Sequence, residues 1–98
     1  MADLPGNPAA RELGYCPCCG YQTLPPGRPG SYELCPVCDW VDDPAQFGDA
    51  EHVSDANNVA LSDARDNFRE HGACVEGAAP NTRDPDEPRD PNWPYESA

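Results

Sequence analysis

The sequence predicts a small α+β fold that is stabilised by a metal ion, and three observations lead to this fold class. The 98 residues include 13 prolines and 8 glycines and are only 38% hydrophobic, so one small core is the most that the chain can build. Four of the six cysteines stand in two Cys-x-x-Cys pairs. One segment has the apolar spacing of a helix. We expect zinc-ribbon-like β-hairpin knuckles followed by one short helix and an irregular acidic tail.

Composition divides the chain into three segments. Residues 1–13 show neither helical nor strand periodicity and are expected to form a flexible lead-in. The metal-stabilised domain is expected over residues 14–76. Residues 77–98 carry five prolines among aspartates and glutamates, which predicts an extended, largely disordered tail. The aromatic residues Trp93 and Tyr95 either pack back onto the core or serve as a docking motif.

Two arms carry the cysteine pairs. Residues 15–23 and 31–40 each place aromatic or β-favouring residues around a Cys-Pro pair, and the prolines and glycines of residues 25–30 form the turn between them. This pattern predicts two short hairpins. The next segment, residues 41–50, is acidic and contains Pro44, so we expect a loop of solvated carboxylates.

The helix is predicted over about residues 62–71. Ser62 suits the N-cap because its hydroxyl can accept a hydrogen bond from an otherwise unpaired backbone N–H, and Gly72 can adopt the left-handed conformation that ends a helix. Three apolar residues recur at helical spacing and would face the core, namely Leu61, Ala64 and Phe68.

The two cysteine pairs have the spacing of a tetrahedral metal site. Each begins with Cys-Pro, and 15 residues (20–34) separate the pairs. Zinc in structural sites takes four ligands tetrahedrally, and thiolates suit it. Iron in a rubredoxin-like centre is the alternative, and we prefer zinc because the spacing between the pairs is short and ribbon-like. The predicted ligands are Cys16, Cys19, Cys35 and Cys38.

Two other cysteines and two histidines lie outside this quartet. Cys18 stands between two predicted ligands, where it either fills the knuckle as a small side chain or acts as a reactive thiol activated by nearby charge. We favour the packing role. Cys74 follows the helix and is the second candidate reactive thiol. A second metal site from these cysteines with His52 and His71 matches no known spacing, and His71 is expected to meet the negative end of the helix dipole instead.

Several motifs together point to a known family. They are Cys16-Pro17-Cys18-Cys19-Gly20-Tyr21, Pro29-Gly30-Ser31-Tyr32-Glu33, Cys35-Pro36-Val37-Cys38, Trp40 with Asp42-Asp43-Pro44 and Gln46, and Ala64-Arg65 with Asn67-Phe68 in the predicted helix. On these motifs the chain resembles the cysteine-rich CPCC family of small bacterial proteins over about residues 15–73. Asp39 departs from the pattern, because the family often has an aromatic or larger apolar residue there. The resemblance implies a metal-binding cysteine fold.

The charge and the cysteines indicate what kind of partner and compartment to expect. The formal net charge is −12, with 18 acidic residues against six arginines and no lysine, so the chain repels phosphate backbones and favours basic partners. The first fifteen residues lack the basic start and apolar stretch of a secretory signal, and no stretch is apolar enough to span a membrane. We therefore expect a protein of the reducing cytoplasm.

Three classes of function follow, in order of preference. The first is a non-enzymatic, zinc-organised module that docks a protein partner and neutralises a basic toxin or nuclease, as immunity proteins or antitoxins do. The second is a thiol-based redox sensor or enzyme that uses Cys18. The third is a nucleic-acid-associated zinc ribbon, which the charge disfavours. Hydrolysis at the metal is not expected, since four thiolates leave no open position for water, and no small-molecule substrate is evident.

Overall fold

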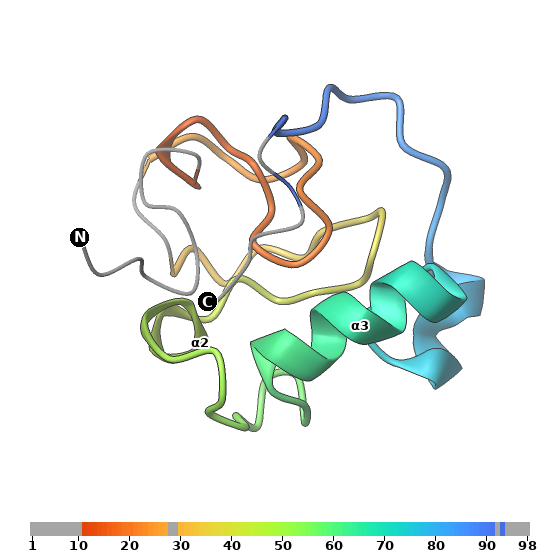
Figure 1. The fold of residues 1–98 in the computed structure, drawn as a ribbon. Coiled ribbons are helices and arrows are strands. Elements are labelled where there is room, and N and C mark those ends of the chain that lie inside the picture. The colour runs from red at the N-terminus through yellow and green to blue at the C-terminus, as the bar shows by residue number, and fades with distance from the viewer. Residues whose placement is uncertain (1–10, 28–29, 92, 94–98) are drawn as a thin grey trace.

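The computed structural model describes residues 11–27, 30–91 and 93, so the predictions for residues 1–10 and for Tyr95 lie outside the described range. Its helices are α2 (Pro44–Gly48), α3 (Leu61–His71) and the 3₁₀ helix η1 (Glu76–Asn81), shown in Figure 1. No helix within the described residues is both long and apolar enough to cross a membrane.

The fold is small, with few helices and little strand. β-Pairing within the described residues consists of isolated antiparallel bridges, which join Tyr15 to Gln22, Tyr21 to Arg89 and Leu34 to Val41. Two of these bridges flank the cysteine pairs, where hairpins are expected. The zinc-ribbon-like hairpins are nevertheless not confirmed. One physical reason is that the prolines at positions 25 and 26 have no N–H to extend a ladder beyond the first arm.

Helix α3 lies where the sequence predicts a helix, but its start is specified differently. The N-cap is Ala60, which makes no side-chain cap bond, so the prediction of Ser62 as N-cap is wrong. The backbone N–H of Ser62 donates instead to the carbonyl of Ala50 at 3.0 Å. This tertiary hydrogen bond pairs one of the N–H groups in the first turn that would otherwise need a capping side chain. At the other end Gly72 has φ 78° and its N–H donates to Phe68, as expected for a left-handed stop.

Helix α2 replaces the loop that the sequence predicts over residues 41–50. The carboxylate of Asp43 accepts from the N–H of Ala45 at 2.9 Å, and Pro44 occupies the first helical position. Proline suits this position because its missing N–H would have no helical partner there. Asp42 and Asp43 are buried rather than solvated. The same Asp-Pro pair that argues against regular structure therefore starts a helix.

The loop between α2 and α3 is pinned by the buried side chain of Gln46. Its amide nitrogen donates to the carbonyls of His52 and Val59 at 2.7 and 2.6 Å. Its oxygen accepts from Ser54 and Asn57, both at 2.8 Å. All four bonds join α2 to residues 52–59, so this stretch without regular structure is fixed by a fully paired polar group.

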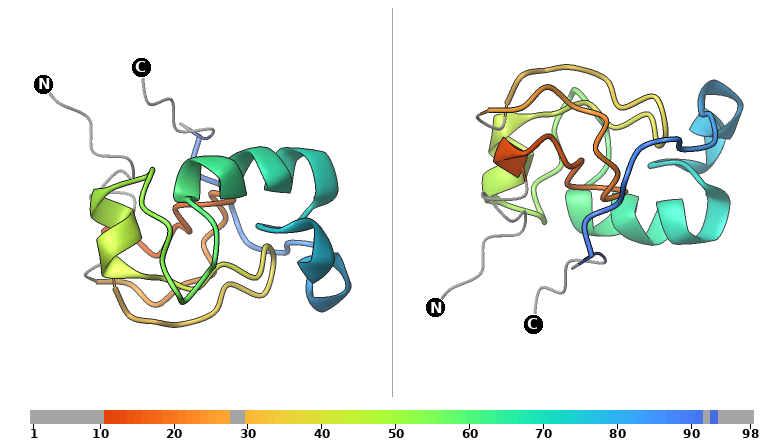
Figure 2. Two further views of the ribbon diagram at one scale, coloured as in Figure 1. Left: turned by 90° about the horizontal axis from the view of Figure 1, so that it is seen from below. Right: turned by 90° about the horizontal axis from the view of Figure 1, so that it is seen from above.

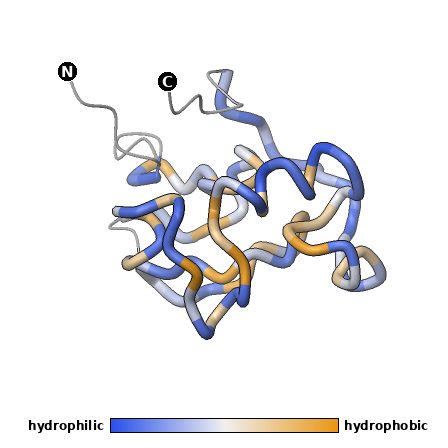
Figure 3. The backbone as a smooth tube through the Cα atoms, turned by 60° about the horizontal axis from the view of Figure 1, so that its bottom comes forward, coloured by the Kyte–Doolittle hydropathy of each residue, from blue (hydrophilic) through white to orange (hydrophobic). Residues whose placement is uncertain are grey.

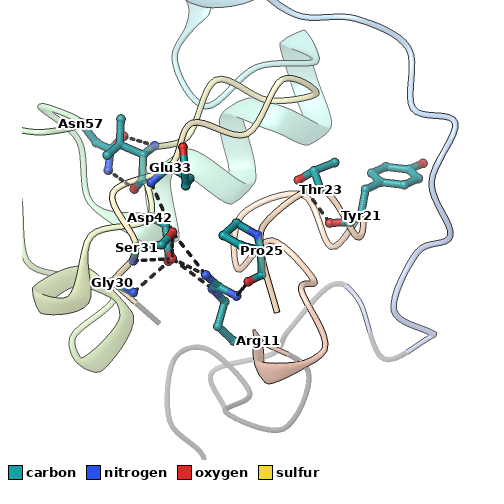
Figure 4. A network of polar contacts seen from close by, with 10 residues as sticks. Arg11, Tyr21, Thr23, Pro25, Gly30, Ser31, Glu33, Asp42 and Asn57 are labelled. Carbon is teal, nitrogen blue, oxygen red and sulfur yellow. Dashed lines mark hydrogen bonds and ion pairs between the residues drawn. The ribbon is translucent and has the colours of Figure 1, made fainter. Parts of the chain in front are cut away.

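A buried ion pair ties the N-terminal side of the described chain to the segment that follows the second arm (Figure 4). Arg11, which the sequence places in the flexible lead-in, is 1% exposed and donates through Nε and Nη2 to one oxygen of Asp42, at 3.1 and 2.5 Å. The same oxygen accepts from Gly30 and Ser31. Burial alone would favour the protonated acid, but the bonds from Arg11 and Ser31 outweigh it and lower the pKa of Asp42.

The hydrophobic core is small and is built largely from sulfur. All six cysteines are buried, and five of them have no exposed surface. Trp40, Leu61 and Ala64 complete its centre, and Tyr21 and Phe68 pack against it. Figure 3 shows that apolar stretches of the chain are short and alternate with hydrophilic ones. A chain of this kind gains little from apolar burial alone and benefits from a covalent or metal cross-link.

As far as residue 91, the segment after α3 does not form the extended tail that the sequence predicts from residue 77. It forms η1, which packs against α3, and then returns along the first cysteine arm, as Figures 1 and 2 show. There Gln22 donates its N–H to the carbonyl of Pro88, and Asp90 donates its N–H to Gly20. Backbone and side-chain bonds to the arm, rather than local periodicity, order this proline-rich stretch.

Candidate metal centre

The four cysteines predicted as ligands come together in one buried cluster. Their Sγ atoms all lie within 4.8 Å of one another, and each residue is fully buried. The Sγ atoms of Cys16 and Cys38 are 3.7 Å apart, and so are those of Cys19 and Cys35. Each close pair joins one sulfur from each arm. The cluster therefore links the two arms, not merely the ends of one turn.

The sulfur spacing fits a tetrahedral ion. An ion about 2.3 Å from each sulfur requires sulfur atoms about 3.8 Å apart, close to the 3.7 Å of the Cys16–Cys38 and Cys19–Cys35 pairs. A disulfide would require about 2.05 Å, and all six cysteines are free thiols. The donor set is four soft, buried sulfurs within 4.8 Å of one another, so the cluster could hold one metal ion.

The two knuckles have the same backbone structure. Each residue of the first knuckle has a counterpart 19 positions later, from Cys16 and Cys35 to Cys19 and Cys38. The first cysteine of each knuckle accepts from the N–H of the fifth residue and donates to the carbonyl of the sixth. The four bonds are Gly20 to Cys16 at 2.9 Å, Asp39 to Cys35 at 2.8 Å, Cys16 to Tyr21 at 2.9 Å and Cys35 to Trp40 at 2.8 Å.

Backbone carbonyls of both knuckles accept hydrogen bonds from residues in the C-terminal half of the chain. In each knuckle the proline carbonyl and the second cysteine's carbonyl accept a hydrogen bond. The donors are Arg65 Nε to Pro17 at 2.8 Å, Arg83 N to Pro36 at 3.1 Å, Arg89 Nε to Cys19 at 3.0 Å and Cys74 N to Cys38 at 2.7 Å. The turns that carry the sulfurs are thus held by hydrogen bonds from α3 and the segments that follow it, as well as by hydrogen bonds within each turn.

Electrostatics favour a cation in the cluster once its thiols are deprotonated. Burial raises the pKa of Cys16, Cys19 and Cys38, because a thiolate is poorly solvated there. Hydrogen bonds from these three thiols lower the pKa of Cys35, and Thr23 Oγ1 lies 2.9 Å from its sulfur. Four thiolates together in this space require a positive ion to offset their charge. A divalent metal supplies that charge.

The other candidate residues do not join the cluster. Cys18 is fully buried and Cys74 is 3% exposed. Burial, followed by the charges of Cys18 and Asp39, raises the pKa of Cys74 to about 12. His52 and His71 have exposed positions, and among the described residues they form no second ligand cluster with these cysteines.

The residues that donate to the knuckle carbonyls carry little signal in the sequence. Arg65 lies on the predicted helix, where arginines are usually solvated, but it is buried. Arg89 and Trp93 lie in a segment that reads as a disordered tail. The one available signal was the presence of an aromatic residue in an otherwise acidic, proline-rich stretch.

Comparison with protein-family models gives a match. A family model described as "Cysteine-rich CPCC" matches residues 14–89, which include both cysteine pairs, α2, α3 and η1. No curated protein matches the chain.

Proposed function

The chain belongs to the cysteine-rich CPCC family, and on this premise we propose that it is a zinc-binding, non-enzymatic module of the cytoplasm that docks a basic protein partner. The observation that carries the metal part is the quartet of buried sulfurs with pairs 3.7 Å apart. Zinc is preferred to iron because the two knuckles are separated by a short, ribbon-like stretch of 15 residues.

A non-enzymatic role is supported by the coordination that the site offers. Four cysteine ligands complete a tetrahedron and leave no position for a metal-bound water, so the ion acts structurally. Thiol chemistry is disfavoured by the burial of Cys18 and Cys74. A reactive thiol is normally accessible and lies in positive surroundings, whereas these two lie beside a group of negative sulfurs.

A basic protein partner is supported by the distribution of charge. Each described arginine is engaged within the chain. Three pair with the carboxylates of Asp42, Asp66 and Glu87, and two donate to the knuckle carbonyls. With a net charge of −12 and its described cations used internally, the protein attracts basic surfaces and repels nucleic acid. Neutralisation of a basic toxin or nuclease, in the manner of an immunity protein, fits this surface.

The metal is tested first, by native mass spectrometry and elemental analysis of protein purified without a tag. We expect one zinc ion per chain and four thiols that alkylating reagents reach only after chelation. Folded protein without a metal ion, or with iron in place of zinc, contradicts this part of the proposal.

The partner is tested by quantitative capture from native lysate on zinc-loaded protein, with the Cys35→Ser variant as matched control. We expect basic proteins to be enriched on the wild type alone and to elute as ionic strength rises, because exposed charges are screened beyond about 8 Å at physiological salt. Equal recovery on both baits, or enrichment of nucleic acid, contradicts the docking role.

A further inference from the structure

The first knuckle is held by a group of residues that we call the C-terminal clamp, defined as Pro88, Arg89, Asp90 and Trp93. Three consecutive carbonyls of the knuckle accept hydrogen bonds from it. Trp93 Nε1 donates to Cys18 at 2.8 Å, Arg89 Nε donates to Cys19 at 3.0 Å, and Asp90 N donates to Gly20 at 2.8 Å. Pro88 accepts from the N–H of Gln22 at 2.9 Å, so the clamp spans the turn and the residues after it.

The clamp's side chains are seated on aromatic rings. The guanidinium carbon of Arg89 lies 3.5 Å from the ring centroid of Trp93 and 4.5 Å from that of Tyr21. Phe68 of α3 meets Trp93 edge to face, with centroids 6.1 Å apart and an interplanar angle of 88°. Cation–π and edge-to-face contacts of this kind are favourable, and they fix the directions of both side-chain donors.

Gly20 shows how closely the clamp approaches the knuckle. A Cβ atom at this position would lie 2.4 Å from Cδ1 of Trp93, so the indole ring lies directly on the knuckle backbone. The second knuckle differs, since it receives donors from the main-chain N–H groups of Cys74 and Arg83. The clamp's side-chain donors can therefore be removed by substitution without changing the backbone bonds of the second knuckle.

From this geometry we propose that Arg89 and Trp93 are positioning residues of the metal centre, which hold the first knuckle in its metal-binding conformation and limit the rate of metal exchange. The inference rests on the metal-binding part of the proposed function. Release of an ion breaks its bonds to the sulfurs of Cys16 and Cys19, and on this proposal the turn that carries them opens only when its carbonyls are freed. The clamp must undock first.

Thermodynamic linkage makes the proposal reciprocal. If docking of the clamp strengthens metal binding by a given factor, metal binding strengthens docking by the same factor. Removal of the metal should therefore loosen residues 88–91 before it unfolds α3, which has its own hydrogen bonds and core contacts.

The test measures transfer of zinc from the loaded full-length protein to a chromogenic chelator. Trp93→Phe keeps a ring on Gly20 but loses the donor to Cys18, and Arg89→Met keeps an apolar stem but loses the donor to Cys19. We expect each variant to bind one zinc ion and to release it about tenfold faster, as the loss of one part-buried hydrogen bond implies. Arg83→Ala is the matched control, because it removes an exposed arginine while its main-chain N–H still donates to Pro36. It should release zinc at the wild-type rate.

Three results overturn the proposal or its basis. Release rates equal to wild type, with lowered melting temperatures, show that the clamp stabilises the fold without positioning the metal centre. Equal acceleration in Arg83→Ala shows that charge rather than positioning is responsible. A wild-type chain that binds no metal overturns both this inference and the proposed function.

Should a variant fail to fold, hydrogen exchange on the wild type gives an independent result. We expect the amides of Asp90, which donates to Gly20, and of Gln22, which donates to Pro88, to lose protection on chelation while those of residues 61–71 keep theirs. Simultaneous loss of protection in both sets of amides overturns the proposal.

Discussion

Gly20 and Asp39 occupy the same position in the two knuckles and share a left-handed backbone conformation, with φ of 82° and 71°. Each donates its N–H to the first cysteine of its knuckle, which is Cys16 or Cys35. Glycine adopts this conformation without strain, whereas a residue with a Cβ is strained by about 1 kcal/mol. The first knuckle has the residue that its backbone favours, and the second does not.

Substitutions at these two positions should change stability in opposite directions. Gly20→Ala should lower the melting temperature of the zinc-saturated protein, since its Cβ would collide with Trp93. Asp39→Gly should stabilise the protein by about 0.5–1 kcal/mol through relief of strain. Gly77→Ala is the control, because nothing lies within 4 Å of its added Cβ. A destabilising Asp39→Gly would show that the aspartate side chain contributes more than its backbone conformation costs.

Replacement of a predicted ligand should differ sharply from replacement of Cys18. Cys35→Ser should lower zinc affinity by orders of magnitude and with it the stability of the fold, because metal-binding free energy contributes to folding. Cys18→Ala should keep one zinc ion per chain and cost about 1 kcal/mol, as expected for a small cavity in a packed interior. Native mass spectrometry and melting curves measure both effects, and loss of zinc from Cys18→Ala would place that thiol in the coordination sphere.

Stability should depend on pH through Asp42. Its pKa is lowered in the folded protein, so its contribution is fully present above the unfolded value of about 3.9 and is lost as pH falls through the folded value. Asp42→Asn should be less stable than wild type by about 3 kcal/mol at neutral pH, because it leaves Arg11 buried without its partner. The difference between the two free energies of unfolding should shrink below about pH 4. Acid loss of metal affects both proteins and cancels in that difference, so a constant difference down to pH 3 would contradict the assignment.

The two helix starts should respond differently to loss of a polar side chain. Asp43→Ala removes the cap of α2 and should cost about 1 kcal/mol. Ser62→Ala should change stability by less than about 0.5 kcal/mol, because the N-cap of α3 is Ala60 and makes no side-chain bond. Urea unfolding of the zinc-saturated proteins compares them. Equal costs would indicate that Ser62 acts as a cap in solution.

The sequence by itself determined the features that depend on neighbouring residues. A Cys-Pro-x-Cys run specifies a tight turn with both sulfurs on one side, so the cluster of Cys16, Cys19, Cys35 and Cys38 could be read from two short motifs. Helix α3 and its stop at Gly72 follow from apolar spacing and from the conformational freedom of glycine. In each case the information lies within a few positions along the chain.

Only the tertiary structure decided which groups hold these local elements in place. Arg11 pairs with Asp42 across 31 positions, and Arg89 reaches Cys19 across 70. An arginine or tryptophan in an acidic, proline-rich segment does not belong to a helical or strand pattern. The sequence also does not indicate which backbone carbonyl such a side chain will bind. Its role emerges only when folding brings a donor to a buried acceptor, because burial makes an unpaired polar group costly and so selects the partner.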